Sequence, residues 1–204
     1  LDNDAAASFD SAAYIENFLA GKAFMSSAPI LRLELKDSKA TATIGETLSS
    51  TETLTLAVEV QTPSWYKVNT LNIYMNKTFI DPGASSGDAN YETIEPNLTT
   101  ALLPQAIQWP NGASGYSYKT ELTLDDSTLN NEDTWLVVEA TGSDTLYPVS
   151  LSSGSATIDS NASNVDDFLT IHGGATPFVL SNPIFIDRDG DGSFVAKYAM
   201  QSAP

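Results

Sequence analysis

Hydrophobic and polar residues alternate along much of the chain, which is the pattern of strands that bury one face. The alternation is clearest in the runs 31–35, 54–60 and 71–75. Strand-like runs return at 116–124, 135–140 and 183–186. Many short strands separated by turn signals favour two packed antiparallel sheets. We therefore predict an all-β fold, an antiparallel β-sandwich of the Ig-like or jelly-roll type.

The intervals between these runs carry the residues that break regular structure. Pro, Gly, Ser and Asn are frequent from 81 to 115, where we expect long loops with one or two short strands. The polar stretch 125–133 predicts a turn region, and the Ser/Ala/Asn-rich stretch 149–164 predicts a loop. Trp135 lies in an apolar run, so we expect it in the core.

One helix is predicted, near the start of the chain. Phe9, Ile15, Phe18 and Leu19 recur at helical spacing, with Ser8 as the expected N-cap and Gly21 as the expected stop. Because this helix is amphipathic, it must pack on something. We divide the chain into a helix and linker, 1–27, and a β-sandwich domain, 28–204.

Charge narrows the range of partners. Nine Lys and Arg against 26 Asp and Glu give a net charge of −17, which repels nucleic acid phosphates and anionic membrane surfaces. No stretch reaches the roughly 20 apolar residues of a membrane-spanning helix. We expect no nucleic acid partner and no membrane span.

Cysteine is absent, which excludes disulfides, thiol nucleophiles and cysteine-ligated zinc. The Thr/Ser/Asn-rich strands, the low lysine content and an acidic loop of the calcium type favour a secreted protein. We expect it in the extracellular space, in the periplasm or on the cell surface.

The acidic loop follows the last predicted strand and reads Asp187-Arg188-Asp189-Gly190-Asp191-Gly192. Alternate carboxylates at the first, third and fifth positions of a tight loop converge on one point, as calcium requires. Gly192 falls at the sharp turn of an EF-hand loop, and the Ser193 carbonyl falls at its backbone ligand. We predict a structural Ca²⁺ site with Asp187, Asp189, Asp191 and Ser193 as ligands.

The loop departs from an EF-hand at the twelfth position, where Tyr198 replaces the bidentate Glu. A further carboxylate must come from elsewhere in the fold, and Asp166, Asp167 and Glu139 are the donors we consider. The alternative is that the Asp-Gly pairs only form a hairpin turn. Three carboxylates within five residues repel one another without a cation, which favours the metal site.

No reaction centre is visible in the sequence. His172 is the only histidine and lies in a turn-like context, so no multi-histidine metal centre can form within one chain. A Gly-x-Ser-x-Gly nucleophile motif is absent, and so is a phosphate-binding glycine-rich loop with its lysine. Trp109, in a long loop between Gln108 and Pro110, is the aromatic residue we select as a sugar-stacking candidate.

Several segments, in order, resemble the C-terminal region of secreted PHP-type metal-dependent hydrolases, the group that includes the CehA/McbA-like metallohydrolases. They are residues 21–29, 58–65, 71–76, 133–140, 146–149 and 177–187, and the last one runs into the acidic loop. Ala28 and Lys77 depart from glycines of the family pattern. The family's catalytic histidines and acids have no counterpart here, so no catalytic residue is carried over.

The resemblance implies a non-catalytic, calcium-stabilised extracellular accessory domain that packs on a catalytic hydrolase domain through the Phe9–Leu19 helix face. The alternative is an independent extracellular carbohydrate-binding or surface and matrix assembly module. A third hypothesis, a stand-alone hydrolase that uses carboxylates and a bound ion, requires metal-dependent turnover by the purified chain.

Overall fold

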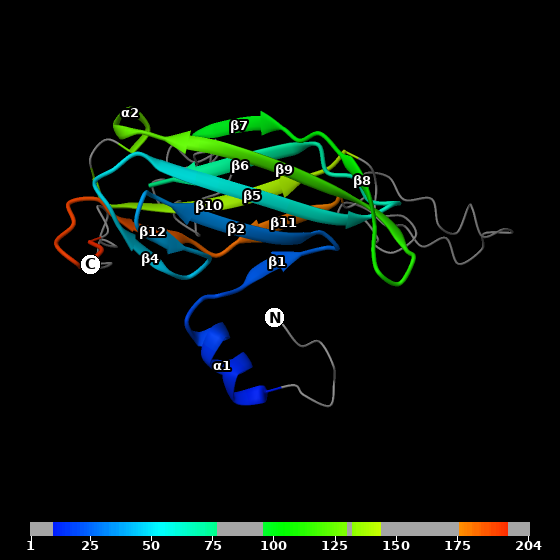
Figure 1. The fold of residues 1–204 in the computed structure, drawn as a ribbon, viewed down its shortest axis with the longest axis horizontal. Coiled ribbons are helices and arrows are strands. Elements are labelled where there is room, and N and C mark those ends of the chain that lie inside the picture. Colours follow the sequence, from blue (N-terminus) through cyan, green and yellow to red (C-terminus); the bar gives the residue numbers. More distant parts are fainter. Residues whose placement is uncertain (1–9, 77–95, 130–131, 144–175, 196–204) are drawn as a thin grey trace, which may run out of the picture.

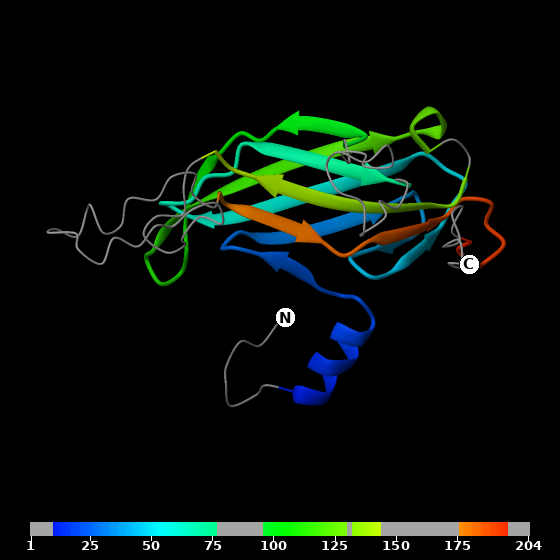
Figure 2. The same ribbon diagram turned by 180° about the vertical axis from the view of Figure 1, so that it is seen from behind.

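The computed structural model describes residues 10–76, 96–129, 132–143 and 176–195. Within them two β-sheets pack face to face, and a short helix stands apart from the sheets near the start of the chain (Figures 1 and 2). The prediction of an all-β fold with one short N-terminal helix is confirmed, with one further helical turn between two strands.

The first sheet, sheet A, is built around β10. One edge of β10 pairs with β6, which pairs with β7, and the other edge pairs with β11 and β12 one after the other. β1 continues the sheet beyond β11, and β4 continues it beyond β12. The strands of sheet A are β1 (Phe24–Ser26), β4 (Thr47–Ser49), β6 (Thr70–Met75), β7 (Leu98–Ala101), β10 (Thr134–Thr141), β11 (Phe178–Ser181) and β12 (Ile184–Asp187).

The second sheet, sheet B, has the order β3-β2-β5-β9-β8 and is antiparallel throughout. In the whole described structure only β12 and β4 pair in parallel. The strands of sheet B are β2 (Ile30–Lys36), β3 (Thr41–Ala42), β5 (Leu54–Pro63), β8 (Gln105–Gln108) and β9 (Ser114–Leu124). β7 and β8 are the short strands expected in the loop-rich stretch.

The core lies between the sheets and is formed by the residues that alternate in the sequence. Every second residue of β2, β5, β6 and β10 is buried, and the residues between them face outward. Sheet B contributes Leu33, Leu56 and Tyr118, and sheet A contributes Ile73 and Leu136. Apolar burial of this extent is the main driving force for the fold.

The helix α1 (Ser11–Leu19) begins at Asp10, whose carboxylate accepts hydrogen bonds from the N–H groups of Ala12 and Ala13. Asp10 is therefore the N-cap in place of the predicted Ser8, which lies with Phe9 outside the described residues. None of the residues of α1 is buried, so the surface on which this helix is expected to pack is not found among the described residues. The second helix, α2 (Asp126–Leu129), is a single turn in the polar stretch before β10.

The position of Trp135 differs from the prediction that it lies in the core. The buried residues of β10 are Thr134, Leu136, Val138 and Ala140, so Trp135 faces the outer side of sheet A and is only half-buried. An apolar run marks a strand, and the register decides which of its residues reach the core.

The described helices are too short to cross a membrane.

Candidate metal centre

The acidic loop leaves the end of β12 and runs beside the start of β10, at the end of the sandwich where the chain is drawn orange-red in Figure 1. The two strands pair in antiparallel register, with Thr134 opposite Ile186. One residue further, Asp133 and Asp187 stand opposite each other. The pairing of sheet A therefore joins an acid from the middle of the sequence to the acidic loop.

Within the loop, each aspartate accepts hydrogen bonds from backbone N–H groups further along. Asp187 accepts from Gly190 at 2.8 Å and from Gly192 at 2.9 Å. Asp189 accepts from the N–H of Asp191, and Asp191 accepts from that of Ser193. Gly190 and Gly192 have φ of 72° and 87°, a conformation that favours glycine. The Asp-Gly alternation therefore winds the backbone around the Asp187 carboxylate.

Asp133, which is not part of the loop, binds two of its backbone N–H groups. Its Oδ1 accepts from the N–H of Arg188 and its Oδ2 from the N–H of Val195, both at 2.7 Å. Asp133, Asp187 and Asp189 each offer a carboxylate oxygen, and these oxygens lie within 4.8 Å of one another. Asp191 does not belong to this group. We call Asp133, Asp187 and Asp189 the carboxylate centre.

Arg188 does not neutralise the carboxylate centre, although it lies between two of its members in the sequence. The Arg188 side chain is buried, and its guanidinium donates to the carbonyl oxygens of Ser50 and Glu52 and to the Asp126 carboxylate. Among the described residues, none of the ion pairs involves a member of the centre. Arg188 instead ties the loop to the segment after β4 and to α2.

Asp187 is the member with the most restricted surroundings, because its relative exposure is 0%. Burial by itself raises the pKa of Asp187, but hydrogen bonds from the Ser49 hydroxyl and from the N–H groups of Gly192 and Gly190 outweigh it and lower the pKa. The carboxylate is therefore ionised at neutral pH, as a metal ligand must be.

This arrangement fits a hard divalent cation. Calcium takes oxygen ligands at about 2.3 to 2.6 Å, so ligand oxygens on opposite sides of one ion stand up to about 5 Å apart. The spread of the three carboxylate oxygens is within that span. The Ser193 carbonyl is predicted as a further ligand, and this stays a prediction. Tyr198, at the twelfth loop position, lies outside the described residues.

Of the three donors considered for the additional carboxylate, only Glu139 is among the described residues, and it does not belong to the centre. Glu139 lies further along β10, where its Oε2 accepts hydrogen bonds from Asn72 and Tyr74 at 2.8 Å each. Asp166 and Asp167 lie outside the described residues. Asp133, at the end of the predicted turn region 125–133, is the carboxylate that joins Asp187 and Asp189 in the described structure.

The aromatic candidates differ in exposure. Trp109 is half-buried, because its indole ring lies against Gly115, where an added Cβ would meet the ring at 2.4 Å. Trp65, in the turn after β5, is 68% exposed and is the exposed tryptophan among the described residues. Trp65 also stands edge-on to Tyr66. His172 lies outside the described residues.

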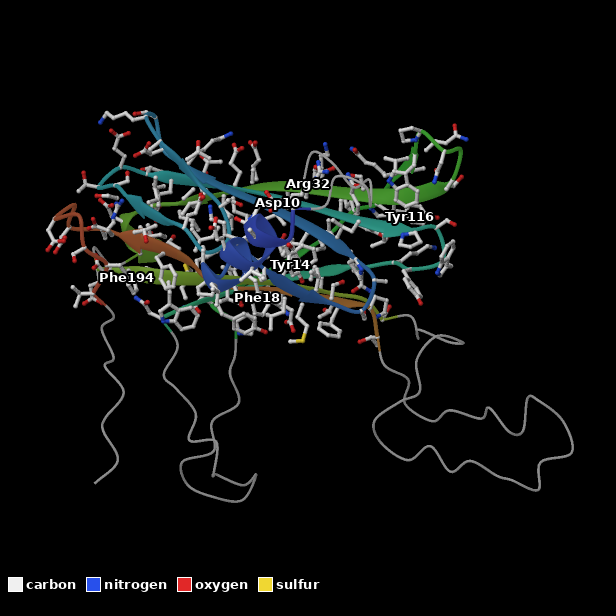
Figure 3. All side chains as sticks on the ribbon, turned by 90° about the horizontal axis from the view of Figure 1, so that it is seen from below. Asp10, Tyr14, Phe18, Arg32, Tyr116 and Phe194 are labelled. Atoms are coloured by element: carbon white, nitrogen blue, oxygen red, sulfur yellow. The ribbon has the colours of Figure 1, made fainter. Side chains whose placement is uncertain are left out.

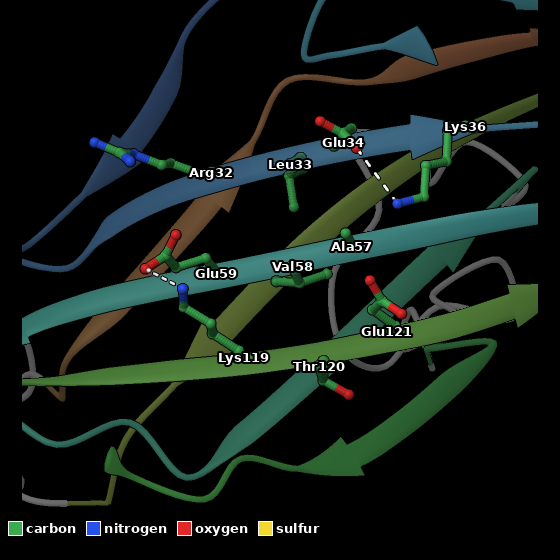
Figure 4. Close-up of a pocket in the computed structure, with 10 residues that line it drawn as sticks. All are labelled: Arg32, Leu33, Glu34, Lys36, Ala57, Val58, Glu59, Lys119, Thr120 and Glu121. Carbon is green, nitrogen blue, oxygen red and sulfur yellow. Dashed lines mark ion pairs between the residues drawn. The ribbon is translucent and has the colours of Figure 1, made fainter. Parts of the chain in front are cut away.

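A polar groove of about 700 Å³ crosses the outer face of sheet B over β2, β5 and β9 (Figure 4). Three basic and three acidic side chains line it, and two ion pairs, Lys36–Glu34 and Lys119–Glu59, neutralise part of this charge. Exposed pairs of this kind are typical of a solvated sheet face. The groove is therefore not the metal centre, and it lies on the sheet that does not carry the acidic loop.

Comparison of the chain with protein families, with characterised proteins and with solved structures gave no match. The resemblance to PHP-type hydrolases consequently stays a hypothesis drawn from the sequence segments alone.

Proposed function

We propose that this protein is a non-catalytic, calcium-stabilised accessory domain that works outside the cytoplasm, and that the carboxylate centre binds its structural Ca²⁺. The observation that carries the proposal is the convergence of Asp133 and Asp189 on the wholly buried Asp187, with Arg188 directed away. Carboxylates this close repel one another, and none of the ion pairs among the described residues involves them; a divalent cation would relieve that repulsion.

The role of the ion is to fasten three parts of the chain together. Asp133 directly precedes β10, Asp187 ends β12, and Asp189 belongs to the loop beyond it. A cation held by all three fixes the loop against the end of sheet A. We infer a structural use of calcium, since the three carboxylates come from the paired ends of two strands and from the loop after them, which one ion would hold together.

The accessory role rests on the resemblance to PHP-type hydrolases and on α1. In this proposal a catalytic hydrolase domain is the partner, and it contacts the apolar side of the helix, where Tyr14, Ile15, Phe18 and Leu19 are exposed. The domain then shapes access to a catalytic site that it does not itself contain.

Thermal unfolding of chelator-treated protein, with and without added Ca²⁺, tests the metal assignment. A ligand that binds only the folded state at a hundred times its Kd stabilises by about 2.7 kcal/mol. For a chain of this size that corresponds to a rise in Tm of roughly 5 to 10 °C. The rise is expected in the wild type and is expected to be lost in Asp189→Asn.

Glu121→Gln is the matched control, because it removes the same charge from an exposed position on sheet B, away from the loop. It is expected to keep the full response to Ca²⁺. An equal response in Asp189→Asn, or none in the wild type, contradicts the assignment.

The second candidate function is an independent carbohydrate-binding module, and the exposed indole of Trp65 is the observation that favours it. Saturable binding to soluble polysaccharides that is lost in Trp65→Ala supports this function. Because the Trp109 ring is packed on Gly115, Trp109→Ala is expected to lower stability along with any sugar binding. Binding unaffected by both variants excludes an aromatic sugar site at either residue.

A further inference from the structure

The groove on the outer face of sheet B has a small residue at its floor and longer side chains on both sides. Glu34 of β2 and Glu121 of β9 stand opposite Ala57 of β5 in the register of the sheet. Because a methyl group lies between two long side chains, the sheet face is hollowed over Ala57 (Figure 4). A groove of about 700 Å³ has room for a small ligand or for a few units of a chain molecule.

Glu59, two residues along β5 from this hollow, presents a carboxylate that is already held in place. Its Oε1 accepts hydrogen bonds from Gln61 Nε2 at 2.9 Å and from Ser117 Oγ at 3.1 Å, and it pairs with Lys119 Nζ at 3.4 Å. These contacts, the Gln61 bond first, lower the pKa of Glu59 although partial burial raises it. All three donors reach Oε1, and none of the described residues donates to Oε2, so this ionised carboxylate keeps one oxygen for a ligand.

Arg32 and Glu121 add charged groups that are not engaged. Neither side chain forms an ion pair or a hydrogen bond within the part of the chain that the structure describes. Arg32 is labelled in Figures 3 and 4, and in the close-up its side chain points away from that of Glu59. The groove therefore offers donors from Arg32 together with acceptors from Glu59 and Glu121.

Charge identifies the class of ligand. Three bases and three acids line the groove and cancel, on a chain of net charge −17. A polyanion is repelled by the chain as a whole, and the equal number of bases leaves no excess negative charge in the groove to select a cation. Hydroxyl groups both donate and accept, so a neutral polyhydroxylated ligand satisfies carboxylate oxygens and guanidinium N–H groups at the same time.

An aromatic ring lies on the same face, further along β9. The Trp109 ring covers Gly115, where an added Cβ would meet it at 2.4 Å. Position 115 faces the same side as Ser117, Lys119 and Glu121, because alternate residues of a strand share a face. Trp109 is half-buried, so part of its ring stays accessible. At about 3.4 Å per residue, roughly 20 Å of β9 separate the ring from the hollow.

We propose that the outer face of sheet B binds a neutral oligosaccharide, which lies along β5 and β9 from the Trp109 ring to the hollow over Ala57. The flat faces of its sugar rings stack on Trp109, and its hydroxyl groups bind Glu59 Oε2 and Arg32. This site deepens the second candidate function, carbohydrate binding, on which it rests, and lies on sheet B rather than at Trp65. Neither the calcium assignment nor the hydrolase partner is needed for it.

Affinity gel electrophoresis of the purified chain tests this site. The neutral probes are soluble glucan, mannan, xylan and galactan, and the charged probe is polygalacturonate. At least one neutral probe is expected to retard the wild type, whereas polygalacturonate is not. No retardation by any neutral probe overturns the proposal, and so does retardation by the polyanion alone.

Two variants test the groove itself. Glu59→Gln keeps the shape of the side chain but removes its charge, and it is expected to weaken binding roughly tenfold, because hydrogen bonds to charged groups are the stronger ones. Ala57→Arg is expected to abolish binding, since its side chain fills the hollow and pairs with the flanking carboxylates of Glu34 and Glu121.

Matched controls carry the same changes on sheet A. Glu139→Gln alters a carboxylate that is also half-buried and also accepts hydrogen bonds from side chains. Ala101→Arg places the same long side chain on an exposed position of β7. Both controls are expected to bind like the wild type. Circular dichroism checks that every variant is folded, which substitution at outward-facing positions predicts.

Binding that survives in both Glu59→Gln and Ala57→Arg overturns the site on sheet B. If that binding is lost in Trp65→Ala, the second candidate function stands with its site at Trp65. If no neutral probe binds, the second candidate function fails together with the site. The calcium response of the first proposed function is measured on stability, so it is decided separately from either result.

Discussion

The carboxylate centre and the apolar side of α1 differ in chemistry, because the first concentrates negative charge and the second concentrates exposed hydrophobic side chains. The centre gathers two carboxylates, those of Asp133 and Asp189, around the buried Asp187, and in our proposal a cation offsets their repulsion. The apolar side of α1 leaves Tyr14, Ile15, Phe18 and Leu19 exposed to solvent, as surface that commonly binds a partner is. Both are held by polar contacts to the same sandwich, through Arg188 in one region and through Lys22 and Asn182 in the other. The comparison teaches that one sandwich holds in place both an acidic loop and an apolar helix, which differ in the ligand or partner they could take.

The largest effect is expected from the contact that fixes α1. In Gly45→Ala the new Cβ would meet backbone atoms of Ala20 and Gly21 at 2.6 and 2.7 Å, and φ at this position is 81°. Overpacking and backbone strain together are expected to lower the free energy of unfolding by about 2 to 4 kcal/mol. Denaturant unfolding measures this loss.

Gly112→Ala separates the two causes. Its φ is 82°, nearly the same, but nothing lies within 4 Å of the added Cβ. Strain alone is expected to lower the free energy of unfolding by about 1 kcal/mol. Equal losses in the two variants would mean that close packing of Gly45 on the helix end contributes nothing.

The next largest loss of stability is expected when Arg188, which attaches the acidic loop to the segment after β4, is replaced. Arg188→Met keeps much of the buried volume but removes the hydrogen bonds to the carbonyl oxygens of Ser50 and Glu52. Leaving buried acceptors without donors is expected to lower the free energy of unfolding by about 2 kcal/mol. Calcium affinity, measured by titration calorimetry, is expected to fall at the same time. If Arg188→Met unfolds and binds Ca²⁺ like the wild type, then Arg188 does not hold the carboxylate centre in place.

The smallest effect is expected at the ion pair between Lys22 and Glu46. The Lys22 ammonium, with the N–H of Thr43, lowers the pKa of Glu46. A lowered folded-state pKa gives stability that is present above the unfolded value near 4.5 and is lost as pH falls through the folded value. Because both side chains are more than a third exposed, Glu46→Gln is expected to lower stability at pH 7 by less than about 1 kcal/mol. Chemical denaturation at pH 7 and below pH 4 checks this, since the difference between variant and wild type shrinks in acid.

The strands could be predicted because burial of one face imposes alternation. The run Leu54 to Val60 lies in β5 and the run Leu71 to Met75 in β6, with every second residue buried as expected. The same reasoning placed Trp135 in the core, since a short apolar run does not reveal which face of its strand is inward. Only the pairing with β6 and β12 fixes that face.

The metal loop could be predicted in part for a similar reason. Local spacing predicted that Asp187 and Asp189 converge, because residues this close in sequence are placed by the turn itself. Asp133 was missed, because its approach depends on the antiparallel register of β10 and β12 over more than 50 intervening residues. An acid directly before a strand that pairs with the loop-bearing strand is the signal that could have found it.

The amphipathic character of α1 could be predicted from the sequence, but what surrounds its apolar side could not. A helical period predicts an apolar side, and it does not tell whether that side is covered within the same chain or by another one. The exposure of Phe18 and Leu19 shows that no described residue of this chain covers that side of the helix.

Calorimetric titration of Ca²⁺ into chelator-treated wild type and Asp133→Asn tests the central claim most directly, because Asp133 is the ligand that the loop spacing alone does not supply. The account predicts one Ca²⁺ per chain in the wild type and at least roughly tenfold weaker binding in the variant, as the loss of one carboxylate ligand implies. Equal binding in both proteins, or no binding in the wild type, would contradict the claim that the carboxylate centre is a calcium site.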